Sequence, residues 1–371
     1  MLDSGVVVQL SRPDGARARL VDVARAARVS VSVASRALGG YGGVAPATRE
    51  RVLAAAAALG YRASWRARSL VAGKDAPLRC AVAGVGVPPQ ELGRYFLGPV
   101  FAGIMAEAGQ EGMDVQLVTS APSDPAEPAA QAFHRLVAED RADGYIVVTG
   151  LPLTPEDTRP LEEAALPYVL TNRHFGDRPA SCVTYAWEGA TQDALRRLHA
   201  LGHRRMALLL PHLQNTTVLG HEQGWLAGAA AHGLAPHEAP VLRYARPSEG
   251  DEANGREMTR ALLTAGLPGS GAVPTAIVGF NDWCALGALR GAAALGVAVP
   301  AQLSIIGFDN TLLGEASTPR LCSYQPQAFE MGRQAARLLG AHLRKEVDGP
   351  RRVIVPVDFV CRESCGPAPG S

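Results

Sequence analysis

Helical periodicity begins about twenty residues into the chain. Residues 20–27, LVDVARAA, carry apolar residues at spacings of three and four, which give the segment one apolar face. Ser30 is suited to cap a second helix over residues 31–38, and Pro46 is suited to the first turn of a third helix that ends at Gly60. Three short helices with a tight turn between the first two predict a helix-turn-helix module, although a generic three-helix bundle would have the same outline.

A different pattern starts near residue 78. Apolar runs predict buried strands, and segments with an amphipathic helical pattern lie between them. The runs are LRCAVAGVGV, MDVQLVTS, DGYIVVTG, PYVLTN, RMALLL, TAIVGF and LSIIGF. Strands separated by helices indicate βαβ units, and the length of this region favours two parallel sheets over one. The predicted fold class is therefore α/β, with a helical head before a larger body of doubly wound parallel sheets.

Two segments lack a pattern that would let them fold alone. Residues 1–18 contain glycine and proline and show no periodicity, so we expect a disordered leader. Residues 62–74, RASWRARSLVAGK, are rich in basic residues and have no sufficient apolar face. We expect this second segment to become helical only against a partner.

The charge is divided unevenly along the chain. The formal net charge is +1, but residues 1–75 hold 12 of the 36 Lys and Arg residues and only 5 of the 35 Asp and Glu residues. The head therefore carries +7 and the remainder −6. A basic head on an acidic body favours attachment to a polyanion, and a solvated basic surface is the alternative.

Composition narrows the class of protein further. Apolar residues make up 47% of the chain, yet no run reaches the ~18–20 apolar residues of a membrane-spanning helix. The N-terminus has no signal-peptide pattern, so a cytoplasmic protein is expected. The six cysteines are scattered, which favours reduced thiols over a disulfide framework or a zinc site, and we expect neither a metal nor a cofactor.

Motifs of common enzymes do not occur in the sequence. GxSxG, GxxxxGK[ST] and HExxH are all missing, and AGVGV after the first strand is only a weak glycine cluster. An enzyme of α/β fold, a sugar-uptake binding protein and a cytoplasmic small-molecule-binding protein remain as alternatives to a DNA-binding regulator. Salt-dependent binding to duplex DNA would separate the regulator from all three.

A set of residues in one register without a gap gives a more specific signal. In the head these are Asp22-Val23-Ala24, Ala27, Val29-Ser30, Ser35-Arg36, Leu38, Val44, Thr48-Arg49-Glu50, Arg51-Val52, Leu59-Gly60-Tyr61, Ala67-Arg68, Ser69-Leu70 and Gly73-Lys74. In the body they are Gly202-His203-Arg204-Arg205, Asn281-Asp282, Gly296-Val297, Val299-Pro300 and Ile306-Gly307-Phe308-Asp309. The pattern resembles the lactose/galactose repressor (LacI/GalR) family of bacterial transcription regulators over about residues 19–363. The resemblance implies a sequence-specific DNA-binding repressor and no enzymatic activity.

The resemblance implies that helix 31–38 lies in the major groove of DNA. Val31, Ser32 and Arg36 are then the candidates for reading bases, because Arg36 can make a bidentate contact to guanine and Val31 can contact a thymine methyl. Candidates for phosphate contacts, which fix register but carry no sequence code, are Ser30, Ser35, Thr48 and Arg49. For Val29, Ala34 and Leu38 we expect core packing instead.

Residues 64–72 match the hinge helix of the family, which folds on operator DNA and enters the minor groove. Leu70 has the position of an apolar wedge that unstacks a base step, and Ser64 and Arg68 are the other DNA contacts expected there. A flexible linker is the alternative interpretation of this segment.

The body resembles a periplasmic sugar-binding protein, in which two lobes close on a ligand at the carboxyl ends of their strands. Asp309 ends a predicted strand, where a carboxylate can accept paired hydrogen bonds from ligand hydroxyls. Asn281 ends another and could reach the cleft, whereas Asp282 is better suited to cap the next helix. The other effector-binding candidates are Tyr95, Phe96, Asn172, Arg173 and His221, with Trp187, Phe280 and Trp283 as further aromatic candidates.

Several positions depart from the pattern of the family, including the start of the hinge, where Ala63-Ser64 replaces Pro-Asn. Val33 and Gly39 replace the usual Thr and Asn, which removes side-chain hydrogen bonds to DNA. Tyr185 replaces an Asp, and His221 replaces an arginine that grips the ligand. An imidazole binds a carboxylate or a diol less firmly than a guanidinium, so the identity of the effector cannot be copied from any known member.

These interpretations divide the chain into five parts. The expected parts are a leader 1–18, a helix-turn-helix domain 19–62, a hinge helix 63–76, an effector-binding and dimerisation body 77–363, and a tail 364–371. The expected lobes of the body are 77–182 with 325–351, and 183–324 with 352–363. A homodimer would present two heads to a near-palindromic operator, and a small polar effector such as a sugar would change the angle between the lobes. Whether that effector is an inducer or a corepressor is open.

Overall fold

The computed structural model describes residues 20–38, 43–59, 78–85, 97–120, 129–139, 142–149, 153–176, 178–213, 215–244 and 250–370. The chain forms two compact units, Met1–Pro77 and Leu78–Ser371, which we call the head and the body. Over the described ranges, no helix is both long and apolar enough to cross a membrane.

The head contains the three helices that the sequence predicts. They are α1 (Leu20–Ala26), α2 (Val31–Leu38) and α3 (Pro46–Ala58). Their apolar faces meet in a small core, in which Val23, Ala34 and Val52 are fully buried and Val29 and Leu38 pack at the edge. The Ser30 hydroxyl accepts a hydrogen bond from the Val33 amide at 3.2 Å, as predicted for a helix cap. The result is a helix-turn-helix arrangement.

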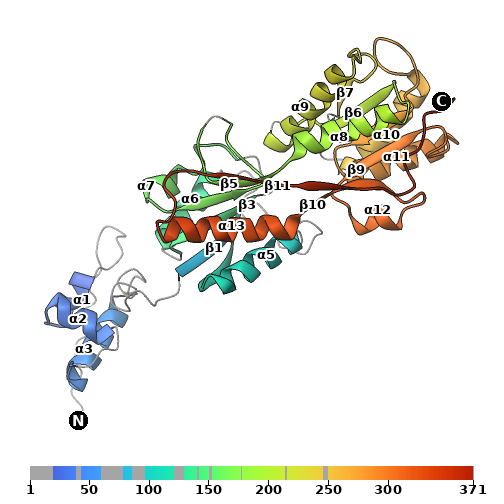
Figure 1. The fold of residues 1–371 in the computed structure, drawn as a ribbon. Helices are drawn as coiled ribbons and strands as arrows, with labels where there is room; N and C mark the ends of the chain where they lie inside the picture. Colours follow the sequence, from blue (N-terminus) through green and yellow to red (C-terminus); the bar gives the residue numbers. More distant parts are fainter. Residues whose placement is uncertain are drawn as a thin grey trace. The chain divides into compact units, whose positions relative to one another are not determined.

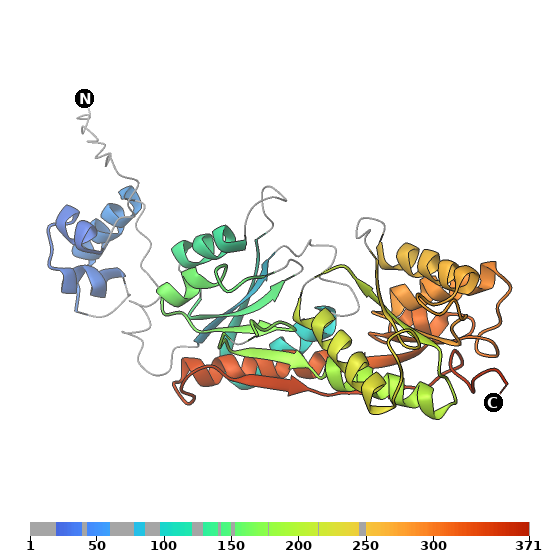
Figure 2. The ribbon, with the colours of Figure 1, turned by 90° about the horizontal axis from the view of Figure 1, so that it is seen from above.

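The first lobe of the body is a six-stranded parallel sheet with the strand order β11-β5-β4-β3-β1-β2. The strands are β1 (Leu78–Val85), β2 (Met113–Ser120), β3 (Gly144–Thr149), β4 (Tyr168–Thr171), β5 (Cys182–Tyr185) and β11 (Arg352–Val355). Alternate residues of β1 belong to different cores, Val82 to one and Ala83 to the other. One face is covered by α5 (Leu97–Gln110) and α13 (Ala328–Leu343), the other by α6 (Ala129–Glu139) and α7 (Arg159–Glu163) (Figure 2).

The second lobe is a six-stranded sheet with the order β12-β10-β9-β8-β6-β7, parallel except for the β10–β12 pair. The strands are β6 (Met206–Pro211), β7 (Val241–Tyr244), β8 (Ala276–Gly279), β9 (Ser304–Phe308), β10 (Cys322–Pro326) and β12 (Val357–Val360). Helices α8 (Trp187–Ala200) and α9 (Thr216–Ala231) cover one face. Helices α10 (Gly250–Ala265) and α11 (Asp282–Ala294) cover the other, and α12 (Leu312–Ala316) follows β9 (Figure 1). The α/β class with two parallel-dominated sheets is as predicted.

The chain passes between the two sheets three times. Each crossing lies a few residues further along the chain than the lobe boundary predicted from the sequence. Residues 183–185 and 352–355, expected in the second lobe, belong to the first sheet because β5 pairs with both β4 and β11. Residues 325–326, expected in the first lobe, belong to β10 of the second sheet. The crossings therefore follow Tyr185, Pro326 and Val355.

The segment expected as a tail packs on the second lobe. The Ile305 amide donates to the Ser364 carbonyl at 2.7 Å, and the Gly366 amide donates to the Ser304 hydroxyl at 3.0 Å. His203, which is fully buried, lies within 3.0 Å of the Gly366 carbonyl through its Nε2. This segment therefore completes the lobe around the GHRR motif.

Candidate functional site

The exposed face of α2 presents the three side chains predicted to read bases. Val31 is 45% exposed, and Ser32 and Arg36 are also exposed. The Arg36 Nε donates to the Ser32 carbonyl at 3.5 Å along the helix surface. One surface of the helix thus combines an apolar side chain, a hydroxyl and a guanidinium, which together can contact base edges in a major groove.

The predicted phosphate contacts have additional roles within the head. The Arg49 Nη1 donates to the Ala37 carbonyl at 3.3 Å, so this side chain holds the end of α2 against α3. The neighbouring Arg51 Nε donates to the Ala27 carbonyl at 3.1 Å and so joins α3 to α1. Ser35 and Thr48 are partly exposed. The expected contacts Ser64, Arg68 and Leu70 and the departure at Gly39 lie outside the described residues.

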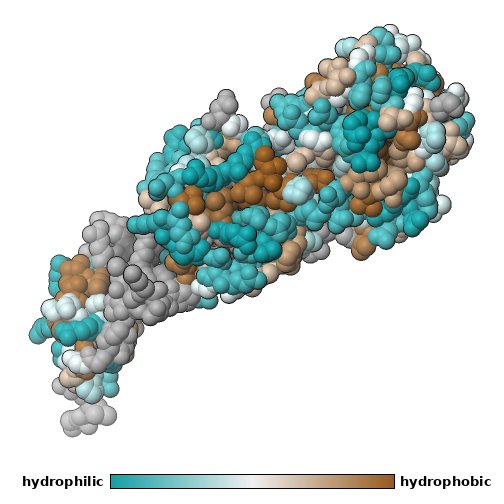
Figure 3. Space-filling view, in the orientation of Figure 1, coloured by the Kyte–Doolittle hydropathy of each residue, from teal (hydrophilic) through white to brown (hydrophobic). Residues whose placement is uncertain are grey.

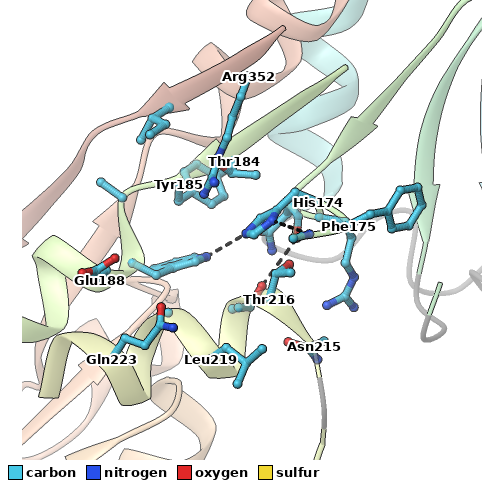
Figure 4. A pocket seen from close by; sticks show the side chains of 18 of the residues that line it. His174, Phe175, Thr184, Tyr185, Glu188, Asn215, Thr216, Leu219, Gln223 and Arg352 are labelled. Atoms are coloured by element: carbon cyan, nitrogen blue, oxygen red, sulfur yellow. Dashed lines mark hydrogen bonds between the residues drawn. The ribbon is translucent and has the colours of Figure 1, made fainter. Parts of the chain in front are cut away.

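A cavity of about 820 Å³ lies in the body where the chain first crosses between the sheets (Figure 4). The ends of β4 and β5, the starts of α8 and α9, and β11 form its walls. Side chains with polar atoms in this lining include Asn172, Arg173, His174, Thr184, Glu188, Gln192, Asn215, Thr216, Thr217, Gln223 and Arg352. The volume falls within the ~300–1,000 Å³ typical of small-molecule sites.

Part of the cavity lining is apolar. Ile354 of β11 lines the cavity and is 57% exposed. Figure 3 shows hydrophobic side chains gathered in a band over the region of β11.

Asn172, one of the predicted effector residues, joins the two lobes beside the cavity. It follows β4 with a φ of 53°, in the left-handed region that asparagine tolerates better than most residues. Its Oδ1 accepts a hydrogen bond from the Trp187 Nε1 at 3.0 Å, and its carbonyl accepts one from the Thr217 Oγ1 at 3.5 Å. Arg173, also predicted, lines the same cavity. The structure thus brings these two candidates together.

His221 lies beneath the wall of the cavity and does not line it, which corrects its predicted role as an effector contact. Its side chain is 1% exposed and stacks on Trp187 with ring centroids 5.0 Å apart. Phe308 and Phe280 meet the imidazole edge-on at 4.5 and 5.3 Å, and its Nδ1 lies 2.8 Å from the Thr191 hydroxyl. Burial lowers the pKa of His221 to about 3, so the ring is neutral at physiological pH.

Asp309 and Asn281 lie at the carboxyl end of the second sheet and do not line the cavity, so the structure does not bring these two candidates together with Asn172 and Arg173. Beside them lies an acid that sequence reasoning missed. The Asn281 Nδ2 donates to Asp251 at 2.6 Å, and the Tyr244 hydroxyl donates to the same carboxylate at 2.5 Å. Asp309 has a φ of 97°, a strained conformation for a residue with a side chain. Burial, together with the charges of Asp282 and Asp251, raises the pKa of Asp309 to about 7.

The roles expected of Asn281 and Asp282 are partly exchanged. Asn281 caps α11, because its Oδ1 accepts from the Cys284 amide at 2.9 Å. Asp282 is fully buried and accepts hydrogen bonds of 2.6 Å from both the Ser323 hydroxyl and the Thr311 amide. It therefore joins the turn after β9 to β10, and burial raises its pKa to about 6.

Several cavity residues had no signal in the sequence. Thr184 and Arg352 come from strands that the hydrophobic pattern did not predict. Asp251, outside the cavity lining, lies in the first turn of a helix that was also not predicted. Of the aromatic candidates, Trp187 lines the cavity and Trp283 is exposed on α11. Tyr95 and Phe96 lie outside the described residues.

Fold and site together define a class of protein, with a helix-turn-helix head on a two-lobed α/β body that contains a cavity of small-molecule size. Residues 19–64 match the family described as bacterial regulatory proteins, lacI family, and residues 195–365 match the periplasmic binding protein-like domain. The transcriptional regulator AglR of Rhizobium meliloti is 30% identical over 346 residues, which cover 92% of each chain. The lactose operon repressor of Escherichia coli is 28% identical over 347 residues, covering 93% of this chain and 90% of the repressor.

Solved structures agree with these relatives. A lac repressor dimer bound to operator and an anti-inducer has a TM-score of 0.65 at 26% identity, covering 94% of this chain and 99% of that one. A complex of the regulator CelR with cellobiose has a TM-score of 0.64 at 25% identity, covering 94% and 100%. The chain belongs to the lacI family of bacterial regulatory proteins, and it is a DNA-binding transcriptional regulator rather than an enzyme.

Proposed function

We propose that this chain is a homodimeric repressor of the cytoplasm, whose affinity for a near-palindromic operator is set by a small polar effector in the body. The observation that carries the proposal is the exposed surface of α2, formed by Val31, Ser32 and Arg36. The opposite face of this helix packs into the core of the head. The lac repressor relative, named as a dimer bound to operator, supports the same arrangement here.

In this proposal the contacts of the head divide by type. Val31, Ser32 and Arg36 read base edges, and Arg36 pairs with a guanine. The phosphate contacts come from Ser30, Ser35, Thr48 and Arg49, and those of the minor groove from Ser64, Arg68 and Leu70. Arg49 is well placed for this task because its bond to Ala37 already orients the guanidinium at the end of α2.

The effector in this proposal is a sugar or a sugar derivative. Asn172 and Arg173 contact it from the lining of the cavity. Asn281 and Asp309, at the carboxyl end of the second sheet and outside that lining, are the candidates from the second lobe. Tyr95 and Phe96 remain candidates for an aromatic face against the sugar ring. The CelR relative, solved with cellobiose, supports a sugar as the class of ligand.

Binding to promoter DNA tests the proposal. Duplexes that tile the promoter flanking the gene are titrated with the full-length chain at several salt concentrations. We expect one duplex with a near-palindromic sequence to bind much more tightly than random DNA, with an affinity that falls steeply as salt rises. Addition of sugars to the bound complex then distinguishes an inducer, which releases DNA, from a corepressor, which tightens binding. Equal affinity for every duplex would contradict the proposal.

A further inference from the structure

The cavity contains two guanidinium groups that no described carboxylate neutralises. Arg173 is partly buried after β4, and Arg352 is exposed on β11 at the edge of the same cavity. Neither side chain has a hydrogen bond or an ion pair to another residue that the structure describes. Burial lowers the pKa of Arg173, since no described neighbour compensates for the hydration that its charge has lost. A partly buried cation without a counter-charge is costly, so its presence in a cavity points to a ligand.

A buried hydroxyl beside these groups also has no described partner. Thr184 of β5 is 4% exposed and lines the cavity, and its Oγ1 makes no hydrogen bond within the described chain. In Figure 4 the Arg352 side chain extends from β11 toward Thr184. Because most buried polar side-chain atoms in proteins are hydrogen-bonded, this hydroxyl is available to a group that enters the cavity.

The start of α9 adds positive potential on the opposite side. Asn215 caps the helix by accepting from the Val218 amide at 2.9 Å, and Thr216 and Thr217 line the cavity. The first amides of a helix lack partners within it and form its positive end. Glu188, exposed in the first turn of α8, is the one carboxylate among the described lining residues. Positive groups therefore outnumber negative ones around this space.

We propose that the effector of this chain is anionic, a sugar acid or a sugar phosphate, and that Arg173, Arg352 and the Thr184 hydroxyl bind its anionic group. The inference rests on the proposed function and narrows the class of effector. A guanidinium offers paired N–H groups that match the oxygens of a carboxylate or a phosphate. A neutral sugar would leave the partly buried charge of Arg173 uncompensated, whereas its hydroxyls suit the amides of Asn172 and Gln223 on the same lining.

A matched panel of probes tests the charge of the ligand. Glucose, galactose and ribose are compared with glucuronate, galacturonate, glucose 6-phosphate and ribose 5-phosphate by thermal shift of the full-length chain at one ionic strength. We expect an acid or a phosphate to bind at least about tenfold more tightly than its neutral parent, the effect of one charge-assisted hydrogen bond. Comparison of the sugar acids with the sugar phosphates shows whether the anionic group is a carboxylate or a phosphate. A neutral sugar that binds as tightly as its charged derivatives would overturn the proposal.

Variants test the placement without knowledge of the natural effector. Inorganic phosphate is titrated, with chloride balancing the ionic strength, into wild type, Arg173→Gln, Arg352→Gln and the control Arg260→Gln. Arg260 is a half-exposed residue of α10 outside the cavity lining. Its replacement by Gln removes the same positive charge as the cavity variants without changing the cavity. We expect phosphate to raise the melting temperature of wild type and of the control, with a midpoint at least about tenfold higher in both cavity variants.

Two outcomes separate failure of this inference from failure of the proposed function. If wild type and the cavity variants respond to phosphate alike, no anionic subsite exists at Arg173 and Arg352, and the inference is overturned. Promoter binding is measured separately, without any sugar or phosphate. If the chain binds no promoter duplex specifically, the proposed function itself is wrong.

Discussion

His221 occupies the position of an arginine that is usual in the family, and its imidazole packs in a group of aromatic side chains. Sequence comparison with the family placed this residue at the ligand, since an arginine is usual there, but the imidazole is covered by Trp187 and kept neutral by burial. Its neighbours come from separate elements, Trp187 from α8, Phe280 from the end of β8 and Phe308 from β9. A sequence can identify the substitution but not this burial, because burial depends on contacts between residues up to about a hundred positions apart.

Arg36 gives the clearest prediction for the head. Arg36→Ala is expected to weaken binding to the operator by about 1–3 kcal/mol, because a bidentate contact to guanine would be lost. Affinity for random duplex should change little, and both are measured at one fixed salt concentration. Equal losses on operator and random DNA would identify Arg36 as a phosphate contact instead.

Asp309 gives a prediction about pH. Burial and the charges of Asp282 and Asp251 raise its pKa to about 7, whereas an aspartate in an unfolded chain titrates near pH 4. Between these values the folded protein holds a proton that the unfolded chain has released, so this group makes stability fall as pH rises from about 4 to 7. Asp309→Asn cannot ionise and should raise the free energy of unfolding at pH 8 by about 1–3 kcal/mol, with no gain at pH 4.

Urea unfolding of the full-length chain at pH 4, 6 and 8 measures this difference. Asp348→Asn is the matched control, because Asp348 is exposed and its neutralisation removes the same formal charge. A variant that is less stable than wild type at pH 8 would show that the Asp309 carboxylate is stabilised by a partner, against our account.

At the scale of elements, the sequence predicted the helices of the head and most strands of the body but missed several short strands. The three helices of the head and seven of the strands follow from apolar spacing. Strands β5, β7, β10, β11 and β12 have four or five residues each and were missed, whereas β4 and β8, which are equally short, were predicted from their apolar runs. Segments of this length are too short for a period to be recognised. Two of them decide where the chain crosses between lobes, because Cys182 pairs with Arg352, which lies far along the chain. The cavity residues on these strands were missed for the same reason.

Packing of α5 against α13 depends on glycine, and this contact supports one wall of the first lobe. A Cβ at Gly103 would overlap the Phe329 carbonyl oxygen, with the Arg333 amide nitrogen 3.0 Å away. Beside this contact, Glu107 of α5 is 2% exposed and pairs with the Arg333 Nε at 2.9 Å. The backbones of the two helices are thus in direct contact at Gly103, and the Glu107–Arg333 ion pair lies beside this contact.

Gly103→Ala is therefore expected to lower the free energy of unfolding by about 1–3 kcal/mol, because the helices must separate. Gly109→Ala in the same helix has no heavy atom within 4 Å of the new Cβ, and we expect a gain of about 0.5–1 kcal/mol from helix propensity. Denaturant unfolding of both variants provides the comparison. A similar effect of the two substitutions would contradict the role assigned to close packing.

At the scale of the whole molecule, three crossings connect two lobes that share one hydrophobic core cluster. That cluster contains Val82 of the first sheet and Leu208 of the second. Asn172 adds hydrogen bonds to Trp187 and Thr217 at the same junction. In the proposed function, a ligand held beside these bonds would bias the angle between the lobes, which is the differential contact that a two-state regulator requires.

The division into head and body gives the last prediction. The body forms a compact unit from residue 78 onward, and the excess of basic residues belongs to the segment before it. Met105 of α5 and Leu117 of β2 are both more than half exposed, which leaves apolar surface on the first lobe for a second copy. We therefore expect residues 76–371 alone to fold as a dimer that does not bind DNA.

Sedimentation equilibrium at micromolar concentration measures the state of this fragment, and a titration with operator DNA at low salt measures its binding. Met105→Glu with Leu117→Glu places charges on the same surface and should shift the fragment to monomer without loss of its helical signal. A fragment that is monomeric before these substitutions would contradict the dimer. Retention of operator affinity would contradict the assignment of DNA binding to the head, since an acidic body has no electrostatic attraction to phosphates.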